Sequence, residues 1–172
     1  MSSESTIWTI GHSTRSVEEF IDVISAHDIE LVADVRRFPG SRRLPHFSSD
    51  ALSHSLIENG IHYRWLEPLG GRRRSDASIV NAWRHPAFSA YAEHVKSEEF
   101  AEGLMELLML SQGLKTAIMC AEVLWWRCHR RIISDVLTSL GANVVHIRDR
   151  DHSELHKLAA PAQLIDGALT YE

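Results

Sequence analysis

The hydrophobic positions of the chain fall into short apolar runs separated by amphipathic segments. Each run is five or six residues long and rich in apolar and β-branched residues, which is typical of strands covered on both faces of a sheet. We expect five such strands, at residues 6–10, 30–35, 61–66, 115–120 and 143–147.

The segments between these runs place apolar residues at helical spacing. The first begins with a capping box, because the Ser16 hydroxyl can reach the amide of residue 19 and the Glu19 side chain can reach back. Glycines follow several of the later segments and are typical helix stops. We expect helices over about 16–27, 50–58, 86–96, 98–112 and 128–140.

This alternation predicts a three-layer α/β/α fold with a mostly parallel sheet of about five strands. The first strand, helix and second strand form one βαβ unit, whose crossover should be right-handed. A chain of 172 residues has the usual size of one domain, so we interpret residues 1–172 as a single α/β domain. In such sheets ligands bind beyond the carboxyl ends of the strands, where the functional residues are therefore expected.

The composition is that of an ordinary globular protein, with 44% hydrophobic and 24% charged residues. No run of about 18 apolar residues predicts a membrane helix, and the first residues lack the basic and apolar regions of a secretory signal. Cys120 and Cys128 are the only cysteines, too few for a disulfide scaffold. We expect a cytoplasmic protein with reduced thiols and no membrane partner, and no pattern specifies a cofactor or an oligomeric state.

The charge is unevenly distributed along the chain. The net charge of −5 argues against a general attraction to DNA or to an anionic membrane. Between residues 36 and 74, however, eight arginines stand against three acidic residues, so this segment carries a charge of +5. Such local basicity indicates an anionic partner, either a small molecule or a nucleic acid.

Glycines, arginines and other polar residues follow four of the predicted strands. A guanidinium group matches the oxygens of a phosphate or carboxylate bidentately, and the amides at a helix start add further donors. The residues expected to bind an anion or a substrate are Gly11, His12, Ser13, Asp34, Arg36, Arg37, Ser41, Arg42, Gly70, Gly71 and Arg130.

Structural roles would also explain several of these residues. Gly11 would permit a turn, and the polar residues at 12–13 would cap a helix. Asp34 would form an ion pair with one of the arginines at 36–37, at the rim of the sheet. The arginines at 72–74 are of a kind that is commonly solvated, although they would also suit a nucleic-acid backbone.

The two cysteines are candidates for chemistry. Cys120 ends a predicted strand, and Cys128 lies at the predicted start of a helix, where the dipole favours a thiolate. A cysteine nucleophile works with a neighbouring acid or base, so the candidate catalytic residues are Cys120, Glu122, Cys128 and His129. The spacing differs from the tyrosine-phosphatase loop, which needs an arginine six residues after its cysteine, where this chain has Trp126.

Other interpretations of this region stay open. Both cysteines would suit small buried packing residues, and together with His129 they would form a zinc site, although the CxxC spacing and an evident fourth ligand are missing. The tryptophans at 125–126 would stack on a base, or cover the core. The histidines at 152 and 156 would chelate a metal if that segment is helical, although with eleven histidines in the chain their spacing also suits coincidence.

A set of motifs resembles one protein family. The motifs are Thr9-Ile10-Gly11-His12-Ser13, Asp34-Val35-Arg36, Pro39-Gly40-Ser41-Arg42, Leu69-Gly70-Gly71, Cys120-Ala121-Glu122 and Cys128-His129-Arg130. Together they extend over about residues 7–147 and resemble the bacterial and archaeal family called domain of unknown function 488. The resemblance implies an α/β fold and a cytoplasmic setting, and it carries no established activity.

Three hypotheses for function follow. The first is an enzyme that acts on a phosphate-containing ligand such as a nucleotide or a nucleic acid. The second is a non-catalytic nucleic-acid-binding module that uses the basic segment 36–74. The third is a metal or redox site built on the cysteines and His129.

Overall fold

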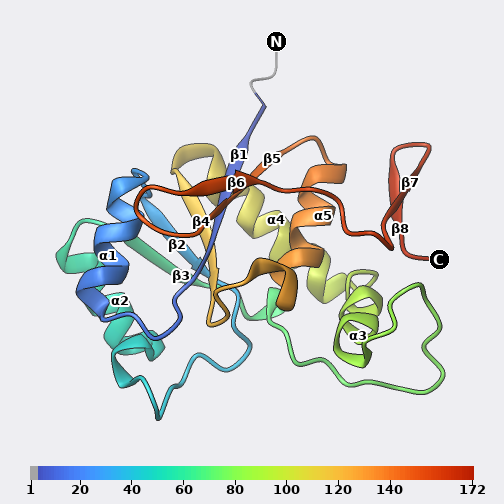
Figure 1. Ribbon diagram of the computed structural model, residues 1–172, viewed down its shortest axis with the longest axis horizontal. Coiled ribbons are helices and arrows are strands. Elements are labelled where there is room, and N and C mark those ends of the chain that lie inside the picture. The colour runs from blue at the N-terminus through green and yellow to red at the C-terminus, as the bar shows by residue number, and fades with distance from the viewer. Residues whose placement is uncertain (1–3) are drawn as a thin grey trace.

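The computed structural model describes residues 4–172 and has a central six-stranded sheet (Figure 1). Its strands are β1 (Thr6–Gly11), β2 (Leu31–Asp34), β3 (His62–Trp65), β4 (Thr116–Cys120), β5 (Asn143–Ile147) and β6 (Ser153–Leu155). They are arranged in the order β3-β2-β4-β1-β5-β6, in which the first five are parallel and β6 is antiparallel to β5.

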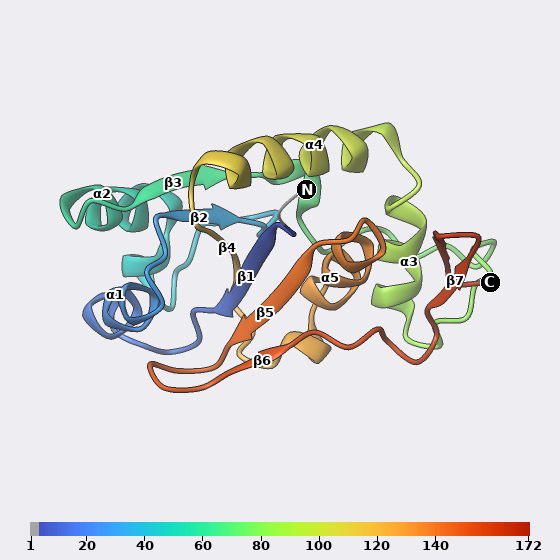
Figure 2. The same cartoon turned by 90° about the horizontal axis from the view of Figure 1, so that it is seen from above.

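Helices cover both faces of the sheet, which gives the three-layer α/β/α fold expected from the sequence (Figure 2). The helices on one face are α1 (Val17–Ala26) and α2 (Ser49–Glu58). Those on the other face are α3 (Pro86–His94), α4 (Glu98–Gly113) and α5 (Arg130–Ser139). None of the helices within residues 4–172 is both long and apolar enough to cross a membrane.

The strand order explains this division of the helices. From β1 to β2 and from β2 to β3 the chain moves toward the β3 edge of the sheet, whereas from β3 to β4 and from β4 to β5 it moves in the opposite direction. Right-handed crossovers therefore place the helices of the two sets of connections on opposite faces.

The same order creates a crevice at one end of the sheet. β4 lies between β1 and β2, and the chain leaves β4 toward one face while it leaves both neighbours toward the other. The loops at the carboxyl ends of these strands consequently separate, and such a point is the usual ligand site of an open parallel sheet.

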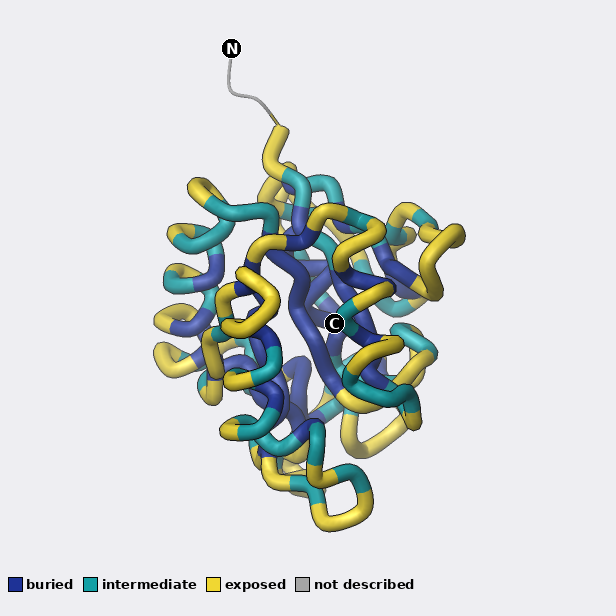
Figure 3. The backbone as a smooth tube through the Cα atoms, turned by 90° about the vertical axis from the view of Figure 1, so that its left-hand side faces the viewer, coloured by how far each residue is buried: buried dark blue, intermediate teal, exposed yellow. Residues whose placement is uncertain are grey.

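The central strands lie in the core of the molecule (Figure 3). Every residue of β2 and β4 is buried, as expected for apolar strands covered on both faces. Phe20 and Ile24 of α1 pack against one face, and Ile132 and Leu137 of α5 lie in the cluster on the other. Each such side chain contributes about 1.5–3 kcal/mol through its removal from water.

The predicted elements are confirmed, with boundaries that differ by no more than two residues. The largest differences are at the C-terminus of α3 and at the start of α5, which begins at Arg130 and not at Cys128. Cys128 itself has an extended backbone, with φ −134° and ψ 171°, and directly precedes the first turn of the helix. The expected capping contact at α1 is present, since the Ser16 hydroxyl accepts from the Glu19 amide at 3.1 Å.

Three short strands in the tail were missing from the sequence prediction. β6 adds a sixth strand to the sheet, and β7 (Gln163–Ile165) and β8 (Ala168–Thr170) form a separate hairpin. The helical interpretation of His152 and His156 is wrong, because β6 lies between them. After the hairpin, the Tyr171 hydroxyl donates to the buried Asp135 carboxylate at 2.6 Å and fixes the tail against α5.

Candidate active site

A pocket of about 700 Å³ opens at the carboxyl ends of β1, β2 and β4, and we call it the strand-end pocket. Five segments that are distant in the sequence contribute to its wall, from residues 12–14, 36–44, 71–72, 120–123 and 128–129. Its position agrees with the crevice that the strand order creates.

Most of the candidate residues named from the sequence line this pocket. Those that do are His12, Ser13, Arg36, Arg37, Ser41, Gly71, Cys120, Glu122, Cys128 and His129. Those that lie outside the lining are Gly11, Asp34, Arg42, Gly70 and Arg130.

Two glycines outside the lining bring the loops around the pocket into contact. A Cβ atom on Gly11 would lie 1.8 Å from the Glu122 carbonyl oxygen, and one on Gly70 would lie 2.6 Å from the Cα atom of Arg37. Neither glycine has a positive φ. The close approach of a neighbouring backbone, and not a turn, therefore requires glycine at both positions.

The two cysteines lie side by side at the base of the pocket. Their Sγ atoms are 3.2 Å apart, although the two residues are eight positions apart in the sequence. The Nε–H of Arg130 donates to both sulfur atoms, at 3.0 Å to Cys120 and 3.2 Å to Cys128. The backbone amide of Arg130 adds a further contact to the Cys128 sulfur at 3.4 Å.

These contacts shift the pKa values of the two thiols in opposite directions. Burial opposes ionisation of Cys128, but the hydrogen bond from Cys120 and the positive charge of Arg130 outweigh it and hold the Cys128 pKa well below its usual value. Burial and the adjacent Cys128 raise the pKa of Cys120 well above its usual value. The two shifts have opposite directions, so Cys128 is the first of the pair to lose its proton.

Arg130 is almost completely buried, at 1% exposure, so it does not present its charge to a ligand in the pocket. Its remaining N–H groups donate to the carbonyl oxygens of Glu122 and Val123 and, at 3.1 Å, to the Thr9 hydroxyl. The role expected from the sequence was direct anion binding. In the structure the guanidinium group of Arg130 instead donates to the sulfur atoms of both cysteines.

A chain of buried polar groups continues from Arg130 across the sheet. The Thr9 hydroxyl accepts from Arg130 and donates its own proton to His146 Nδ1 at 2.6 Å, because the bonds that run from His146 to the Asp135 carboxylate leave Nδ1 unprotonated. His146 Nε2–H then donates to His156 Nδ1 at 2.8 Å, and His156 Nε2–H donates to Asp135 at 2.7 Å. Each bond fixes the direction of the next, so the chain holds Arg130 in one orientation.

Asp34 and Arg36 form a buried bidentate ion pair, as the structural interpretation of these residues anticipated. Arg36 Nε donates to Oδ1 of Asp34 at 2.9 Å, and its Nη2 donates to Oδ2 at 2.7 Å. The Tyr63 hydroxyl also donates to Oδ2, at 2.5 Å. Arg36 nevertheless lines the pocket, with its Nη1 atom 3.5 Å from His12 Nε2.

The two histidines of the pocket are neutral bases. Burial lowers the pKa of His12 to about 4 and also lowers the pKa of His129. His12 Nδ1–H donates to the Ser13 carbonyl at 2.7 Å, and His129 Nε2–H donates to the Val35 carbonyl at 2.6 Å. The unprotonated atoms are therefore Nε2 of His12 and Nδ1 of His129.

Arginines dominate the charge of the pocket wall. The arginine and carboxylate residues that line it are Arg36, Arg37, Arg43, Arg72 and Glu122. Asp34 neutralises one of these arginines, so the wall keeps an excess of positive charge. Arg42 and Arg43 are neighbours and both are exposed, but only Arg43 lines the pocket.

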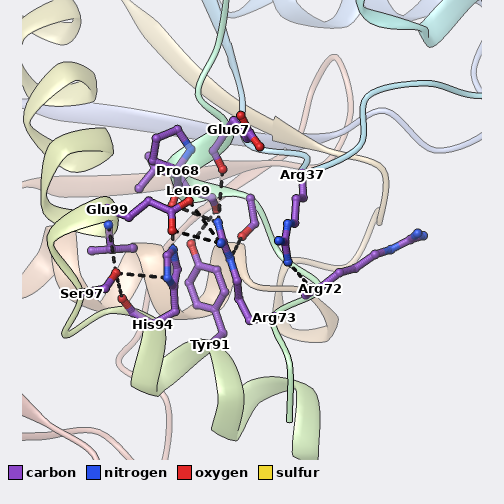
Figure 4. A network of polar contacts seen from close by, with 12 residues as sticks. Arg37, Glu67, Pro68, Leu69, Arg72, Arg73, Tyr91, His94, Ser97 and Glu99 are labelled. Carbon is purple, nitrogen blue, oxygen red and sulfur yellow. Dashed lines mark hydrogen bonds and ion pairs between the residues drawn. The ribbon is translucent and has the colours of Figure 1, made fainter.

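A second polar network fixes the loop that carries Arg72 (Figure 4). Arg73 donates to the carbonyl oxygens of residues 67, 68 and 70 and pairs with Glu99 of α4. The Tyr91 hydroxyl and His94 Nε2 hold the carbonyls of residues 69 and 68. Arg73 is therefore a structural residue within the 72–74 run, whereas Arg72 extends away from the network (Figure 4).

The tryptophans lie beside the pocket and not within its lining. The Trp125 ring stacks on His146 at 4.2 Å, and its Nε1–H donates to Glu154 of β6 at 2.9 Å. One ring face of Trp125 is thus already occupied by a protein side chain. Trp126 lies under the guanidinium group of Arg148, 5.2 Å from its ring centre.

Within residues 4–172, no group of three or more histidine, cysteine, aspartate or glutamate side chains is arranged to hold a metal ion. His129 already uses its Nε2 atom in the bond to Val35. The cysteines instead contact each other and Arg130.

The sequence reasoning missed Thr9, His146 and Asp135, which belong to the hydrogen-bond chain that holds Arg130. The available signal was polar side chains inside predicted strands and on the apolar face of a predicted helix. Buried polar groups need hydrogen-bond partners, so such positions indicate an internal network even where the partners are unknown.

The family model described as domain of unknown function DUF488 matches residues 16–137. The match includes both cysteines and the arginine-rich segment, and begins after His12, so it is shorter than the range of 7–147 suggested by the motifs. A search of curated proteins and a search of solved structures give no match. The match covers more than two thirds of the chain, which therefore belongs to the DUF488 family.

Proposed function

We propose that this protein is a cysteine-dependent enzyme that acts on a small anionic substrate, most plainly one that carries a phosphate group. The observation that carries the proposal is the Cys128 sulfur, which contacts the Cys120 thiol and two N–H groups of Arg130 at the base of an arginine-lined pocket. A thiolate stabilised in this way is the usual form of a cysteine nucleophile.

The wall of the pocket supports an anionic substrate. Arg37 Nη1 donates to the Arg72 carbonyl at 2.9 Å, which ties these two pocket arginines to each other. Arg43 and Arg72 are exposed and carry guanidinium groups without an acidic partner among the described ion pairs of residues 4–172. Guanidinium groups bind phosphate oxygens bidentately, so this wall suits the charged end of the substrate.

The chemical step in this proposal is nucleophilic. The Cys128 thiolate attacks an electrophilic atom of the bound substrate and displaces a leaving group, and water then releases the covalent intermediate. Nδ1 of His129 is the unprotonated nitrogen and accepts the proton of that water. Only glycine fits beside this atom, because a Cβ on Gly71 would lie 2.9 Å from it.

Ligand-induced thermal stabilisation tests the binding part of the proposal. Inorganic phosphate, mononucleotides and short oligonucleotides are added to the wild type and to Arg43→Gln, with Arg42→Gln as the matched control outside the pocket. We expect stabilisation of the wild type and of Arg42→Gln, and a loss of about tenfold or more in affinity for Arg43→Gln.

Two results would overturn this binding assignment. One is the absence of stabilisation by every anion. The other is an equal loss of affinity in both variants with oligonucleotides alone, which is the behaviour of a general nucleic-acid-binding surface.

A further inference from the structure

We infer that Cys120 and Cys128 form a dithiol–disulfide couple that exchanges with small, negatively charged disulfides. The inference rests on Cys128 as the nucleophile of the proposed function, and it adds a redox reaction and a substrate class to the same pocket. In this couple Cys120 takes part in the reaction, whereas the nucleophilic step of the proposed function requires only Cys128.

The two sulfur atoms are already close to bonding distance. They are 3.2 Å apart, and a disulfide bond of about 2.05 Å needs a movement of only about 1 Å. Cys128 is half-buried, whereas Cys120 is 3% exposed at the end of β4. An incoming disulfide therefore meets Cys128 first, and Cys120 reaches it from the protein side.

The environments of the two thiols suit the two steps of exchange. Thiol–disulfide exchange requires a thiolate that attacks and a second thiol that displaces the first product. Cys128 contacts two N–H groups of Arg130, and its lowered pKa makes it the attacking thiolate. Cys120 keeps its proton until the mixed disulfide has formed, because its pKa is raised while Cys128 is a thiolate.

The reaction balances without an external reductant. The Cys128 thiolate attacks one sulfur of the substrate disulfide, forms a Cys128–substrate disulfide and releases one substrate thiolate. The Cys120 sulfur then attacks the Cys128 sulfur and forms the Cys120–Cys128 disulfide, while the second substrate sulfur leaves and takes the Cys120 proton. The protein loses two electrons, and the substrate disulfide becomes one thiolate and one thiol.

The pocket selects the charge of the disulfide. Four arginines and one glutamate line the wall, and one of the arginines is neutralised by Asp34. A disulfide that carries carboxylates is attracted into this wall, and one that carries ammonium groups is repelled. The volume of about 700 Å³ is also within the usual range for small-molecule pockets, so it is large enough for a small disulfide.

Two disulfides of opposite charge test the inference on the full chain. Reduced protein is mixed with oxidised glutathione, which is anionic, or with cystamine, which is cationic, and each rate is divided by the rate of a small free thiol. We expect oxidised glutathione to react about tenfold faster after this correction, and high salt to remove most of the difference. The final product should be the intact chain lighter by two hydrogens, with no free thiol.

Cysteine and arginine variants separate the steps. Cys120→Ser should stop at a stable mixed disulfide on the remaining cysteine, and Cys128→Ser should lose the fast reaction. Arg43→Gln should slow oxidised glutathione and leave cystamine unchanged or faster, while Arg42→Gln behaves like the wild type. Both arginines are exposed, so these two variants keep the fold and remain informative even if a cysteine variant does not fold.

The outcomes distinguish this inference from the proposed function. A wild type that ends as a mixed disulfide on Cys128 contradicts the couple but leaves the nucleophile intact. Equal corrected rates for the two disulfides contradict the selection by charge. If Cys128 reacts neither with disulfides nor with iodoacetamide at neutral pH, both the inference and the proposed nucleophile are wrong.

Discussion

Arg130 connects the chemistry of the strand-end pocket to the interior of the molecule. Its guanidinium group contacts both sulfur atoms on one side and the Thr9 hydroxyl on the other. A buried arginine is costly unless its N–H groups are paired, and here the carbonyl oxygens of residues 122 and 123 accept from Nη2. We therefore expect the orientation of Arg130 to control the pKa of Cys128.

Thr9→Val tests this control at a single hydroxyl. Valine keeps the shape but leaves Arg130 and His146 without their shared partner, so the free energy of unfolding should fall by about 1–3 kcal/mol and the pKa of Cys128 should rise. Urea unfolding and the pH dependence of alkylation measure the two effects. Thr138→Val is the matched control, because the buried Thr138 hydroxyl has no hydrogen-bond partner among residues 4–172, and this variant should keep both values.

The lowered pKa of His12 leads us to expect a loss of stability in mild acid. Its pKa is about 4 in the folded protein and about 6.5 in the unfolded chain, so over this interval the unfolded chain binds a proton that the folded protein does not. The stabilisation is complete above pH 6.5 and is lost as the pH falls toward 4, by about 3 kcal/mol. Urea unfolding of His12→Gln should show a free energy of unfolding that depends less steeply on pH between these values, because unfolding takes up nearly one proton fewer than in the wild type. An unchanged pH dependence would contradict the assignment.

Part of this residue-level picture could be predicted from the sequence. The adjacency of Cys128, His129 and Arg130 is visible in the chain, and the two cysteines could be grouped as one feature. The burial of Arg130 could not be predicted, because its partner Thr9 is 121 residues away in the sequence and only folding brings the two together. The sequence therefore favoured direct anion binding for Arg130.

At the level of elements, the loop between β4 and α5 decides the shape of the pocket. It crosses directly over the end of β1, where the Glu122 carbonyl approaches Gly11. The helix boundaries and the five parallel strands were predicted because periodicity and helix stops are local signals. The contact between Gly11 and this loop is not local, so the sequence suggested a ligand site or a turn at Gly11 instead.

Gly11→Ala should be strongly destabilising. The new Cβ atom would lie 1.8 Å from a backbone oxygen, so the loop must shift, at a cost of about 3 kcal/mol or more in the free energy of unfolding. Gly113→Ala is the matched control, since no atom lies within 4 Å of the position that its Cβ would take and its φ is not positive. Equal stability of the two variants in urea unfolding would show that the loop does not approach β1 in this way.

At the level of the whole molecule, the C-terminal tail completes the network that begins at the cysteines. The chain of hydrogen bonds runs from Arg130 to Asp135, and Tyr171 near the end of the protein donates to the same carboxylate. The three-residue strands of the tail have too little sequence to show a periodicity, and their partners are distant, so neither β6 nor the β7–β8 hairpin could be predicted.

Tyr171→Phe tests the attachment of the tail. Removal of the hydroxyl takes one donor from the fully buried Asp135 carboxylate, and the free energy of unfolding should fall by about 1–3 kcal/mol. Hydrogen exchange should rise first in the β7–β8 hairpin, because this contact is one of those that attach the segment to the core. A tail whose exchange is unchanged would contradict this role of Tyr171.

The pH dependence of Cys128 alkylation tests the central claim most directly. Wild-type protein is treated with iodoacetamide across a pH series, and the modified cysteine is identified by mass spectrometry of its peptides. The account predicts that Cys128 reacts first, with an inflection below the value of about 8.5 for a free thiol. An inflection at or above that value, or preferential modification of Cys120, would contradict it.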